Sequence, residues 1–287
     1  MKMETSVSVV IPTLNAEAEI DELLNQLELQ TVAPSEVIII DSSSDDCTVE
    51  IAKRHSQVRL IEIKRSEFDH GGTRNIGFNE SFGDFVLFMT QDAVPTDRLM
   101  IENLLYPFVD DRVAIVSGRQ LPKEDARLFE RLVREFNYPS ISNKRTKEDI
   151  ERLGIKAFFS SDVCCMYRRT SLAKIGGVPS PCSTNEDMLA AARCLKLGMS
   201  VCYSAEARVF HSHNLSLRQQ FNRNRKIGAF LREHEDEVDV PSEIGEGGKL
   251  VHYVASSLTE GREYLELFRF ILDCMARYAG NIIGRNE

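Results

Sequence analysis

Residues 82–95, with the sequence FGDFVLFMTQDAVP, contain a short apolar run that stops abruptly at a polar segment. The run covers residues 85–89, and Thr-Gln-Asp follows it, ending at Asp92. Such a run is typical of a strand that helices cover on both faces, as in parallel sheets. Open α/β sheets bind ligands at the carboxyl ends of their strands, so Asp92 is a candidate ligand for a metal ion or a phosphate-bearing molecule. The alternative is that Asp92 caps a helix beginning near Thr96.

Segments of strand and helix character alternate on both sides of this run. The other strand-like segments cover residues 6–14, 36–41, 58–64 and 113–118. This alternation predicts βαβ units and an α/β fold with a mostly parallel central sheet flanked by helices. Right-handed crossovers place the carboxyl ends of such strands at one edge, so Asn15, Asp41 and Asp92 are expected on the same face. No glycine-rich phosphate loop follows the first strand, so a nucleotide would be held by side chains and a metal ion.

The later part of the chain carries further strand and helix signals. Residues 123–151 are charge-rich and predicted to form a solvated, mainly helical excursion, residues 157–169 a strand, residues 200–211 two short strand-like pieces, and residues 215–234 a helix. The predicted organisation is a catalytic domain of residues 1–240 and a C-terminal helical extension of residues 241–287. Within the catalytic domain, residues 1–95 form the predicted nucleotide-binding half and residues 96–240 the acceptor half.

Composition narrows the class of protein. The chain has 287 residues and a net charge of −9, which disfavours binding to nucleic acid. An acidic protein that handles phosphates usually needs a cation. The seven cysteines form no CxxC pair, which is typical of core residues in a reducing compartment. No signal peptide is visible, and no apolar stretch reaches the roughly 20 residues of a spanning helix. We expect a cytoplasmic protein and leave open a peripheral contact with the inner face of the membrane.

Several motifs together resemble the inverting glycosyltransferases of family 2, which have the GT-A fold. The matching segments are VSVVIPTLNAE, VIIIDSSSDDCT, HGGTRNIG, FVLFMTQDAVP and NEDMLAAARCLKLG, within about residues 7–225. The combination of FDHGGTRN, TQDA and HSHN is most similar to the rhamnosyltransferase branch. Members of that branch generally use dTDP-L-rhamnose as donor and build bacterial surface polysaccharides. The resemblance implies metal-dependent transfer of L-rhamnose, with inversion, to a growing cell-surface polysaccharide or a lipid-linked glycan.

The resemblance also implies which residues carry the chemistry. Asp187 matches the catalytic base, and Glu186 would orient the acceptor hydroxyls. One positioned carboxylate suffices to take the proton of an attacking hydroxyl, while a metal ion absorbs the charge of the leaving diphosphate. The alternative for both acids is stabilisation of a helix amino end, because an apolar helical pattern follows them.

The implied metal site departs from the family pattern. The usual Asp-x-Asp is replaced by Thr-Gln-Asp, in which Asp92 matches the last position. His211 matches a position where related enzymes place a metal-binding histidine, and His213 is the alternative ligand. A carboxylate and an imidazole suit Mn²⁺ or Mg²⁺ completed by diphosphate oxygens and water. Either histidine would instead be structural if it bonded to the backbone.

A larger set of side chains is implied for the nucleotide sugar. These residues are Thr13, Asn15, Glu17, Asp41, Ser43, Arg74, Asn75, Gln91, Gln220, Arg223 and Arg225. Arg74 is equally compatible with a surface ion pair. The last three residues are similar to the family's Q-x-x-R motif without its tryptophan, and the alternative for them is a solvated helix face.

Two other functions remain open from the residues alone. One is transfer from another donor, such as a UDP-sugar, since one fold serves many sugars. The other is a non-catalytic scaffold that binds a sugar nucleotide, which the missing first aspartate favours and the retention of Asp92, Asp187 and His211 disfavours. For the C-terminal helices, the alternatives are packing on the catalytic domain, a homo-oligomer contact, and docking on a membrane surface.

Overall fold

The computed structural model describes residues 5–238 and 243–287. Within residues 5–238, nine strands form one sheet in the order β3-β2-β1-β4-β8-β6-β9-β5, and β7 pairs with β9. The strands are β1 (Val7–Thr13), β2 (Glu36–Asp41), β3 (Val58–Glu62), β4 (Phe85–Met89), β5 (Val94–Pro95), β6 (Val113–Leu121), β7 (Asn143–Arg145), β8 (Cys164–Arg168) and β9 (Ser200–Phe210). The α/β class expected from the alternating pattern is confirmed.

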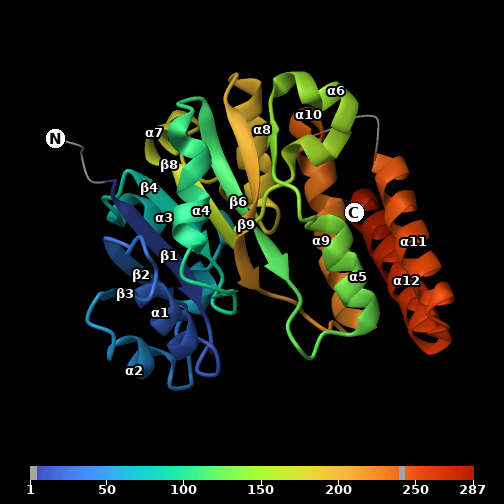
Figure 1. The fold of residues 1–287 in the computed structure, drawn as a ribbon, viewed down its shortest axis with the longest axis horizontal. Helices are drawn as coiled ribbons and strands as arrows, with labels where there is room; N and C mark the ends of the chain where they lie inside the picture. Colours follow the sequence, from blue (N-terminus) through green and yellow to red (C-terminus); the bar gives the residue numbers. More distant parts are fainter. Residues whose placement is uncertain (1–4, 239–242) are drawn as a thin grey trace.

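Helices cover both sides of the sheet, and α11 and α12 lie at the end of the molecule farthest from β3 (Figure 1). The helices are α1 (Ile20–Glu28), α2 (Thr48–Ala52), α3 (His70–Glu80), α4 (Met100–Leu105), α5 (Leu128–Asn137), α6 (Ile150–Leu153), α7 (Arg169–Lys174), α8 (Glu186–Lys196), α9 (Leu217–Glu233), α10 (Glu235–Val238), α11 (Glu243–Glu260) and α12 (Tyr264–Asn286). No helix in the described part of the chain combines the length and the hydropathy needed to cross a membrane.

The apolar run of β4 is continuous because the strand is buried on both faces. Val9 of β1 and Leu87 of β4 join a core that also contains the leucines of α1. Val10 and Phe88, their neighbours along the strands, join the opposite core under α8. Successive side chains of a strand point to opposite faces, so both faces of this sheet require apolar residues. This double burial fixes where the polar residues after β4 emerge.

The sheet is mixed, whereas the sequence predicted a mostly parallel one. The pairs β1–β2, β2–β3, β1–β4 and β6–β9 are parallel, and the pairs β4–β8, β6–β8, β5–β9 and β7–β9 are antiparallel. The βαβ interpretation is therefore correct for the first four long strands. It fails at β8, which lies between β4 and β6 and runs antiparallel to both. An apolar run identifies a buried strand but carries no information on its direction.

Two local predictions are also wrong. The charge-rich residues 123–151 are not simply solvated, because Phe129 and Val133 of α5 are buried against Phe270 of α12 and its neighbours. Residues 200–211 contain one strand of 11 residues rather than two pieces. Its pairing with β6 is irregular, with a register shift between Gly118 and Arg119.

The C-terminal helices pack on the rest of the chain. Residues Gly280 and Gly284 of α12 lie directly against the backbone of α9. A Cβ atom added at Gly280 would lie 2.3 Å from the carbonyl oxygen of Phe221, and one at Gly284 would lie 1.9 Å from that of Arg225. Only glycine permits so close an approach of two helices. The predicted boundary between residues 240 and 241 falls outside the described residues.

Candidate active site

A cavity of about 440 Å³ opens where β1 and β4 end. Its walls come from the segments that follow β1, β2 and β4, from α3, and from the segment after β9. The lining residues are Pro12, Thr13, Leu14, Glu19, Ser42, Arg65, Phe68, His70, Arg74, Thr90, Gln91, Asp92 and His213. The cavity lies at the carboxyl ends of the parallel strands, where the sequence predicts a ligand site. We refer to it below as the strand-end cavity.

Thr13 and Gln91 are the predicted nucleotide-binding residues that line this cavity together with Arg74. The Gln91 side chain also ties the two strand ends together, since its amide accepts from the Leu14 N–H and donates to the Leu14 carbonyl. The hydroxyl of Thr13 donates to Asp41 over 3.0 Å. Both residues are thus held in fixed positions at the cavity wall.

Asp41, Ser43, Asn15 and Glu17 lie close together but bond to the protein itself. Asp41 is fully buried, and its carboxylate accepts from both the N–H and the hydroxyl of Ser44. The Ser43 hydroxyl donates to the Ile63 carbonyl. The remaining two contacts in this group are Asn15 Oδ1 with the Asp45 N–H and Glu17 Oε2 with the Cys47 N–H. These bonds brace the loop after β1 against the loop after β2, so the four side chains shape the cavity margin, and their contact with a nucleotide stays a prediction.

Asp92, His211 and His213 lie together beside the strand-end cavity, which Asp92 and His213 line. One potential ligand atom from each lies within 4.8 Å of the others. Asp92 Oδ2 is 3.5 Å from His211 Nε2 and 3.4 Å from His213 Nε2. The predicted pair of Asp92 and His211 is thus brought together, and His213 joins it. Asp92 is not a helix cap, because the carboxylate of Asp97 accepts from the Leu99 N–H before α4.

The hydrogen bond made by the Nδ1 atom of His211 determines which ring nitrogen carries the proton. Its Nδ1 atom lies 2.9 Å from Gln120 Oε1, which also accepts from Arg134. Arg134 can only donate, so the Gln120 amide oxygen must face both groups, and His211 Nδ1 must carry the ring proton. Burial lowers the pKa of His211 to about 3, so the ring is neutral. Its Nε2 lone pair therefore points at the carboxylate of Asp92.

This arrangement fits a bound cation. Asp92 Oδ2 is buried and has no hydrogen-bond donor among the described residues. The pKa of Asp92 is lowered although burial alone would raise it, and with both imidazoles neutral the Lys123 ammonium, 3.8 Å from Asp92 Oδ2, is the positive charge that keeps the carboxylate ionised. A carboxylate oxygen and an imidazole lone pair that face each other are ligand types that divalent metal ions take. Gln120 orients the imidazole, as second-sphere partners of metal ligands do. Gln120 belongs to no motif, and sequence reasoning missed it.

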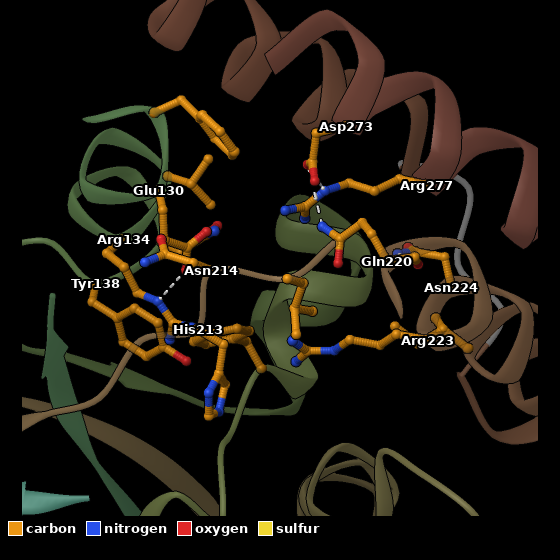
Figure 2. A pocket seen from close by; sticks show the side chains of 16 residues that line it. Glu130, Arg134, Tyr138, His213, Asn214, Gln220, Arg223, Asn224, Asp273 and Arg277 are labelled. Atoms are coloured by element: carbon orange, nitrogen blue, oxygen red, sulfur yellow. Dashed lines mark hydrogen bonds and ion pairs between the residues drawn. The ribbon is translucent and has the colours of Figure 1, made fainter. Parts of the chain in front are cut away.

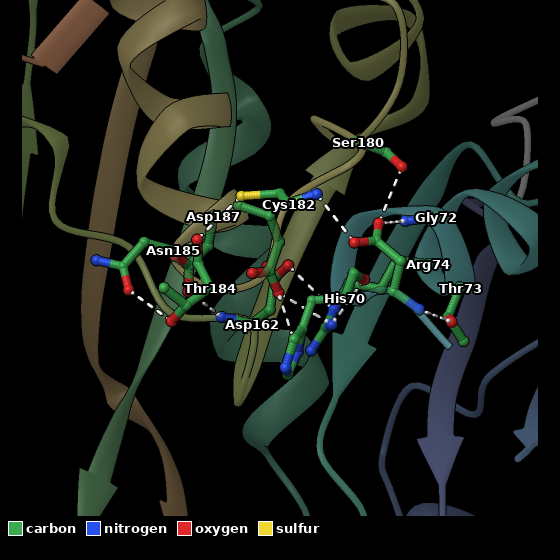
Figure 3. Close-up of polar contacts among 12 residues, drawn as sticks. His70, Gly72, Thr73, Arg74, Asp162, Ser180, Cys182, Thr184, Asn185 and Asp187 are labelled. Atoms are coloured by element: carbon green, nitrogen blue, oxygen red, sulfur yellow. Dashed lines mark hydrogen bonds and ion pairs between the residues drawn. The ribbon is translucent and has the colours of Figure 1, made fainter. Parts of the chain in front are cut away.

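Asp187 lies in the first turn of α8, beside a group of charged residues (Figure 3). Its Oδ2 accepts from the Asp162 N–H over 3.1 Å, and its Oδ1 accepts from the Met188 N–H over 2.7 Å. Burial, together with the nearby carboxylates of Glu186 and Asp162, raises the pKa of Asp187 well above its usual value. A carboxylate with a raised pKa is a stronger base, which suits the removal of a proton from a hydroxyl.

Arg74 holds this acidic group together. Its guanidinium lies 3.1 Å from Asp162 Oδ2 and 3.0 Å from Glu186 Oε1, and its side chain is only 5% exposed. The surface ion pair considered from the sequence is therefore wrong. Although Arg74 borders the strand-end cavity, its positive charge is already neutralised by Asp162 and Glu186. Glu186 is likewise buried against Arg74, which explains its position better than contact with acceptor hydroxyls.

The prediction for Asn75 is also corrected. Its amide donates to the Val178 carbonyl and accepts from the Val178 N–H, and both distances are below 3 Å. Asn75 therefore binds the backbone after α7, whereas Arg74, the preceding residue of the same helix, contacts the charged group. One N–H and one lone pair of the amide are taken up by this backbone, so Asn75 anchors the segment after α7 to α3.

A second cavity, of about 200 Å³, lies between α5, α9 and α12 (Figure 2). His213 borders both cavities, so the second cavity adjoins the group formed by Asp92, His211 and His213. Polar side chains dominate its labelled wall: Glu130, Arg134, Tyr138, Asn214, Gln220, Arg223, Asn224, Asp273 and Arg277. Burial, Arg134 and Arg277 lower the pKa of Arg223, which indicates a crowding of positive charge. We refer to it as the helix cavity.

The Q-x-x-R motif is divided between this cavity and the surface. Gln220 is buried and donates to Asp273 of α12, so the C-terminal helix takes up its amide N–H. Arg223 lines the helix cavity, whereas Arg225 forms an ion pair with Glu287 at 3.1 Å. Arg225 lies outside both cavities, and its contact with a diphosphate stays a prediction. Helical spacing explains the division, because residues two apart point to different sides of a helix.

Strand ends that line a cavity, a carboxylate–histidine group and a nearby buried carboxyl group fit a nucleotide-sugar transferase. The family model of Glycosyl transferase family 2 matches residues 8–176. The chain is 36% identical to the O-antigen chain rhamnosyltransferase RfbN of Salmonella typhimurium and 37% identical to the O-antigen chain rhamnosyltransferase WbaN of Salmonella anatum. Each match covers 98% of this chain and 90% of the relative.

Two solved structures show the same fold. One is the mannosyltransferase PcManGT from Pyrobaculum calidifontis in complex with GDP-Man and Mn²⁺, with a TM-score of 0.66, 16% identity, and coverage of 98% of this chain and 85% of that one. The other is S. aureus TarS in complex with UDP-GlcNAc, with a TM-score of 0.63, 16% identity, and coverage of 89% and 73%. The chain belongs to glycosyltransferase family 2, has the GT-A fold, and is a glycosyltransferase with rhamnosyltransferase homologues.

Proposed function

We propose that this protein transfers L-rhamnose from dTDP-L-rhamnose to a growing cell-surface polysaccharide or lipid-linked glycan, with inversion and with a divalent metal ion. The near full-length similarity to two O-antigen chain rhamnosyltransferases supports the donor sugar and the acceptor class. The cavity at the strand ends, with its carboxylate and histidines, supports the metal dependence. A cytoplasmic enzyme that meets its acceptor at the membrane is consistent with this proposal.

Asp92, His211 and His213 would hold the metal ion, which when bound would neutralise the charge of the leaving diphosphate. Two imidazole nitrogens and one carboxylate oxygen suit Mn²⁺ better than Mg²⁺, which prefers oxygen ligands. The second histidine therefore compensates for the missing first aspartate of the usual motif. The fold neighbour PcManGT was solved with Mn²⁺, which is consistent with this choice.

Asp187 is the proposed general base. Its Oδ2 atom is held by the Asp162 N–H and its Oδ1 atom by the Met188 N–H, so the carboxylate keeps one orientation while a lone pair on each oxygen stays available. Arg74 neutralises Asp162 and Glu186 next to it. A single base on one side of the sugar and a leaving group on the other describe inversion by direct displacement.

The two cavities divide the substrates. Thr13 and Gln91 line the strand-end cavity, which has the size and position for the nucleotide. The helix cavity, reached past His213, would take sugar. Its mixture of aromatic, amide and guanidinium groups suits a carbohydrate, which presents apolar faces and many hydroxyls.

The second candidate is transfer from a UDP-sugar, favoured by the fold neighbour TarS with UDP-GlcNAc. The deciding experiment incubates purified protein with dTDP-L-rhamnose, Mn²⁺ and a lipid extract that supplies acceptors, and measures released dTDP and the anomeric configuration of the product by NMR. The proposal predicts release that stops with chelator and falls by at least about 10³-fold in Asp187→Asn. Release from UDP-sugars only would move the donor, and no release from either would indicate a non-catalytic scaffold.

A further inference from the structure

The outward face of α12 is an uncharged apolar surface that the described part of the chain leaves uncovered. Six large side chains of this helix make up the surface, and we refer to them as the α12 stripe: Tyr264, Phe268, Ile271, Met275, Tyr278 and Ile282. Their exposed fractions run from 41% to 72%. Singly exposed apolar residues are normal, but a contiguous apolar strip along a whole helix marks an interaction site.

The spacing within the α12 stripe is that of a coiled-coil seam. Successive members are separated by 4, 3, 4, 3 and 4 residues, which is the alternation of the two apolar positions in a heptad. The opposite face of the helix carries Phe270, Asp273, Gly280 and Gly284, which are buried. The helix therefore has two separate contact faces, one for α9 and one directed away from the protein.

The stripe is complementary to itself in an antiparallel arrangement. If two copies meet about a two-fold axis level with residue 273, Tyr264 faces Ile282 of the other copy, Phe268 faces Tyr278, and Ile271 faces Met275. Each layer then combines the two different heptad positions, as antiparallel coiled coils require. A two-fold contact needs a surface that is complementary to itself, and this register provides one. Antiparallel packing also opposes the two helix dipoles favourably.

Charge disfavours a membrane surface as the partner. Helices that bind anionic lipid carry lysines and arginines beside their apolar face. Arg269 and Arg277 of α12 lie on the other side of the helix from the stripe and pair with Glu266 and Asp273 of the same helix. Arg285, which helical spacing places beside the stripe, donates to Asn281. The whole chain has a net charge of −9, which repels anionic lipid. A second copy of the same neutral seam meets no such repulsion.

We propose that the α12 stripe is the interface of a homodimer in which two α12 helices pack antiparallel. The inward face of the same helix contributes Asp273 and Arg277 to the helix cavity. Dimer contacts on the outward face would therefore stabilise the helix that forms this cavity wall. The interface lies at the end of the molecule away from the strand-end cavity of the N-terminal half, as the position of α12 shows (Figure 1). The strand-end cavities of both subunits therefore stay accessible in the dimer.

Sedimentation velocity of the full chain tests the interface. The wild type is expected to sediment as a dimer, and Phe268→Lys or Tyr278→Glu alone should weaken the dimer by at least about tenfold, because each buries a charge in the seam. The double variant F268K/Y278E should recover the dimer relative to both single variants, since the antiparallel register places residue 268 opposite residue 278. Tyr106→Glu, at an aromatic residue 78% exposed outside the stripe, is the matched control and should leave the dimer intact.

A circular dichroism melt checks that every variant is folded. A monomeric wild type would overturn the proposal, and so would a dimer that both single variants leave unchanged. A double variant weaker than both single variants would overturn the antiparallel register, because like charges would then meet in a parallel pair. Flotation with vesicles of phosphatidylcholine and phosphatidylglycerol is run in parallel, and a monomer that floats would assign the stripe to lipid instead.

Discussion

The Nε2 atom of His211 lies 3.5 Å from Oδ2 of Asp92, and the proton of the His211 ring is on the other nitrogen, directed at Gln120. Two lone pairs that face each other in a buried site repel unless a cation lies between them. This relationship supports the proposed metal site in a chain that lacks the usual pair of aspartates, and the first two predictions test it.

The first prediction concerns the metal ligands themselves. His211→Ala or Asp92→Asn should abolish the difference in dTDP binding between Mn²⁺ and chelator, because each removes one of the converging ligand atoms. Isothermal titration calorimetry measures this difference directly. His252→Ala, at an exposed histidine of α11, is the control and should bind like the wild type. Metal-dependent binding that survives in both ligand variants would show that the ion is held elsewhere.

The second prediction concerns Gln120. Gln120→Leu keeps the approximate size of the side chain but removes the acceptor for His211 Nδ1–H and for Arg134. The ring then loses its fixed orientation and tautomer, and Mn²⁺ affinity should fall by about 10–100-fold. A competition titration with a fluorescent metal indicator measures the affinity. Gln26→Leu on α1 is the matched control, and an unchanged affinity in Gln120→Leu would contradict the proposed orientation of His211.

The third prediction concerns pH. Asp187 must be deprotonated to act as a base, so the transfer rate should rise with pH through the pKa of Asp187, which burial, Glu186 and Asp162 raise. Glu186→Gln removes one of these negative neighbours and should lower that pKa, so the acid limb of the kcat/KM profile should move to lower pH. Glu206→Gln, at an exposed position, should leave the limb in place. A limb that stays in place in Glu186→Gln would remove Asp187 from the role of base.

The fourth prediction concerns stability. Arg74→Met leaves the buried carboxylates of Asp162 and Glu186 without their counter-ion, and the free energy of unfolding at neutral pH should fall by about 3–5 kcal/mol. Arg74→Lys keeps the positive charge but loses the planar guanidinium that contacts both carboxylates. Its free energy of unfolding should lie between those of the wild type and of Arg74→Met. Urea unfolding measures all three proteins. Arg152→Met, which removes an exposed pair with Asp149, should unfold like the wild type, and an equally mild effect of Arg74→Met would refute the buried cluster.

The fifth prediction separates two arginines of one helix. Arg223 lines the helix cavity and Arg225 pairs with Glu287, so Arg223→Ala should lower kcat/KM for transfer by about 10–100-fold while Arg225→Ala changes it little. Steady-state rates of dTDP release compare the two. The reverse order of effects would support the diphosphate role that the sequence motif suggested for Arg225.

The sequence was sufficient for the position of the site but not for its internal contacts. The apolar run before Asp92 requires a strand covered on both faces, and such strands end at a shared edge, so the location follows from local pattern alone. His211 was predicted from a motif match and lies on the segment after β9, 119 residues further along the chain than Asp92. Only the return of β9 beside β6 and β5 brings the two together.

The predictions that failed depended on long-range contacts. Arg74 reads as a helix-surface residue because its two acidic partners, Asp162 and Glu186, are supplied by segments about a hundred residues away. From the sequence alone, Gln120 cannot be distinguished from any other polar residue near the end of a strand. The antiparallel direction of β8 depends on the path of the chain between β6 and β8, which no local pattern encodes. In each case the missing information was the identity of a distant neighbour.

The most direct test of the central claim is calorimetric binding of dTDP and of UDP to the wild type and to Asp92→Ala, each with Mn²⁺ and with chelator. The account predicts that dTDP binds in the presence of Mn²⁺, that chelator weakens this binding, and that Asp92→Ala binds weakly under both conditions. Tighter binding of UDP than of dTDP would contradict the assignment of the donor. Equal binding with Mn²⁺ and with chelator, in a folded wild-type protein, would contradict the metal site at Asp92, His211 and His213.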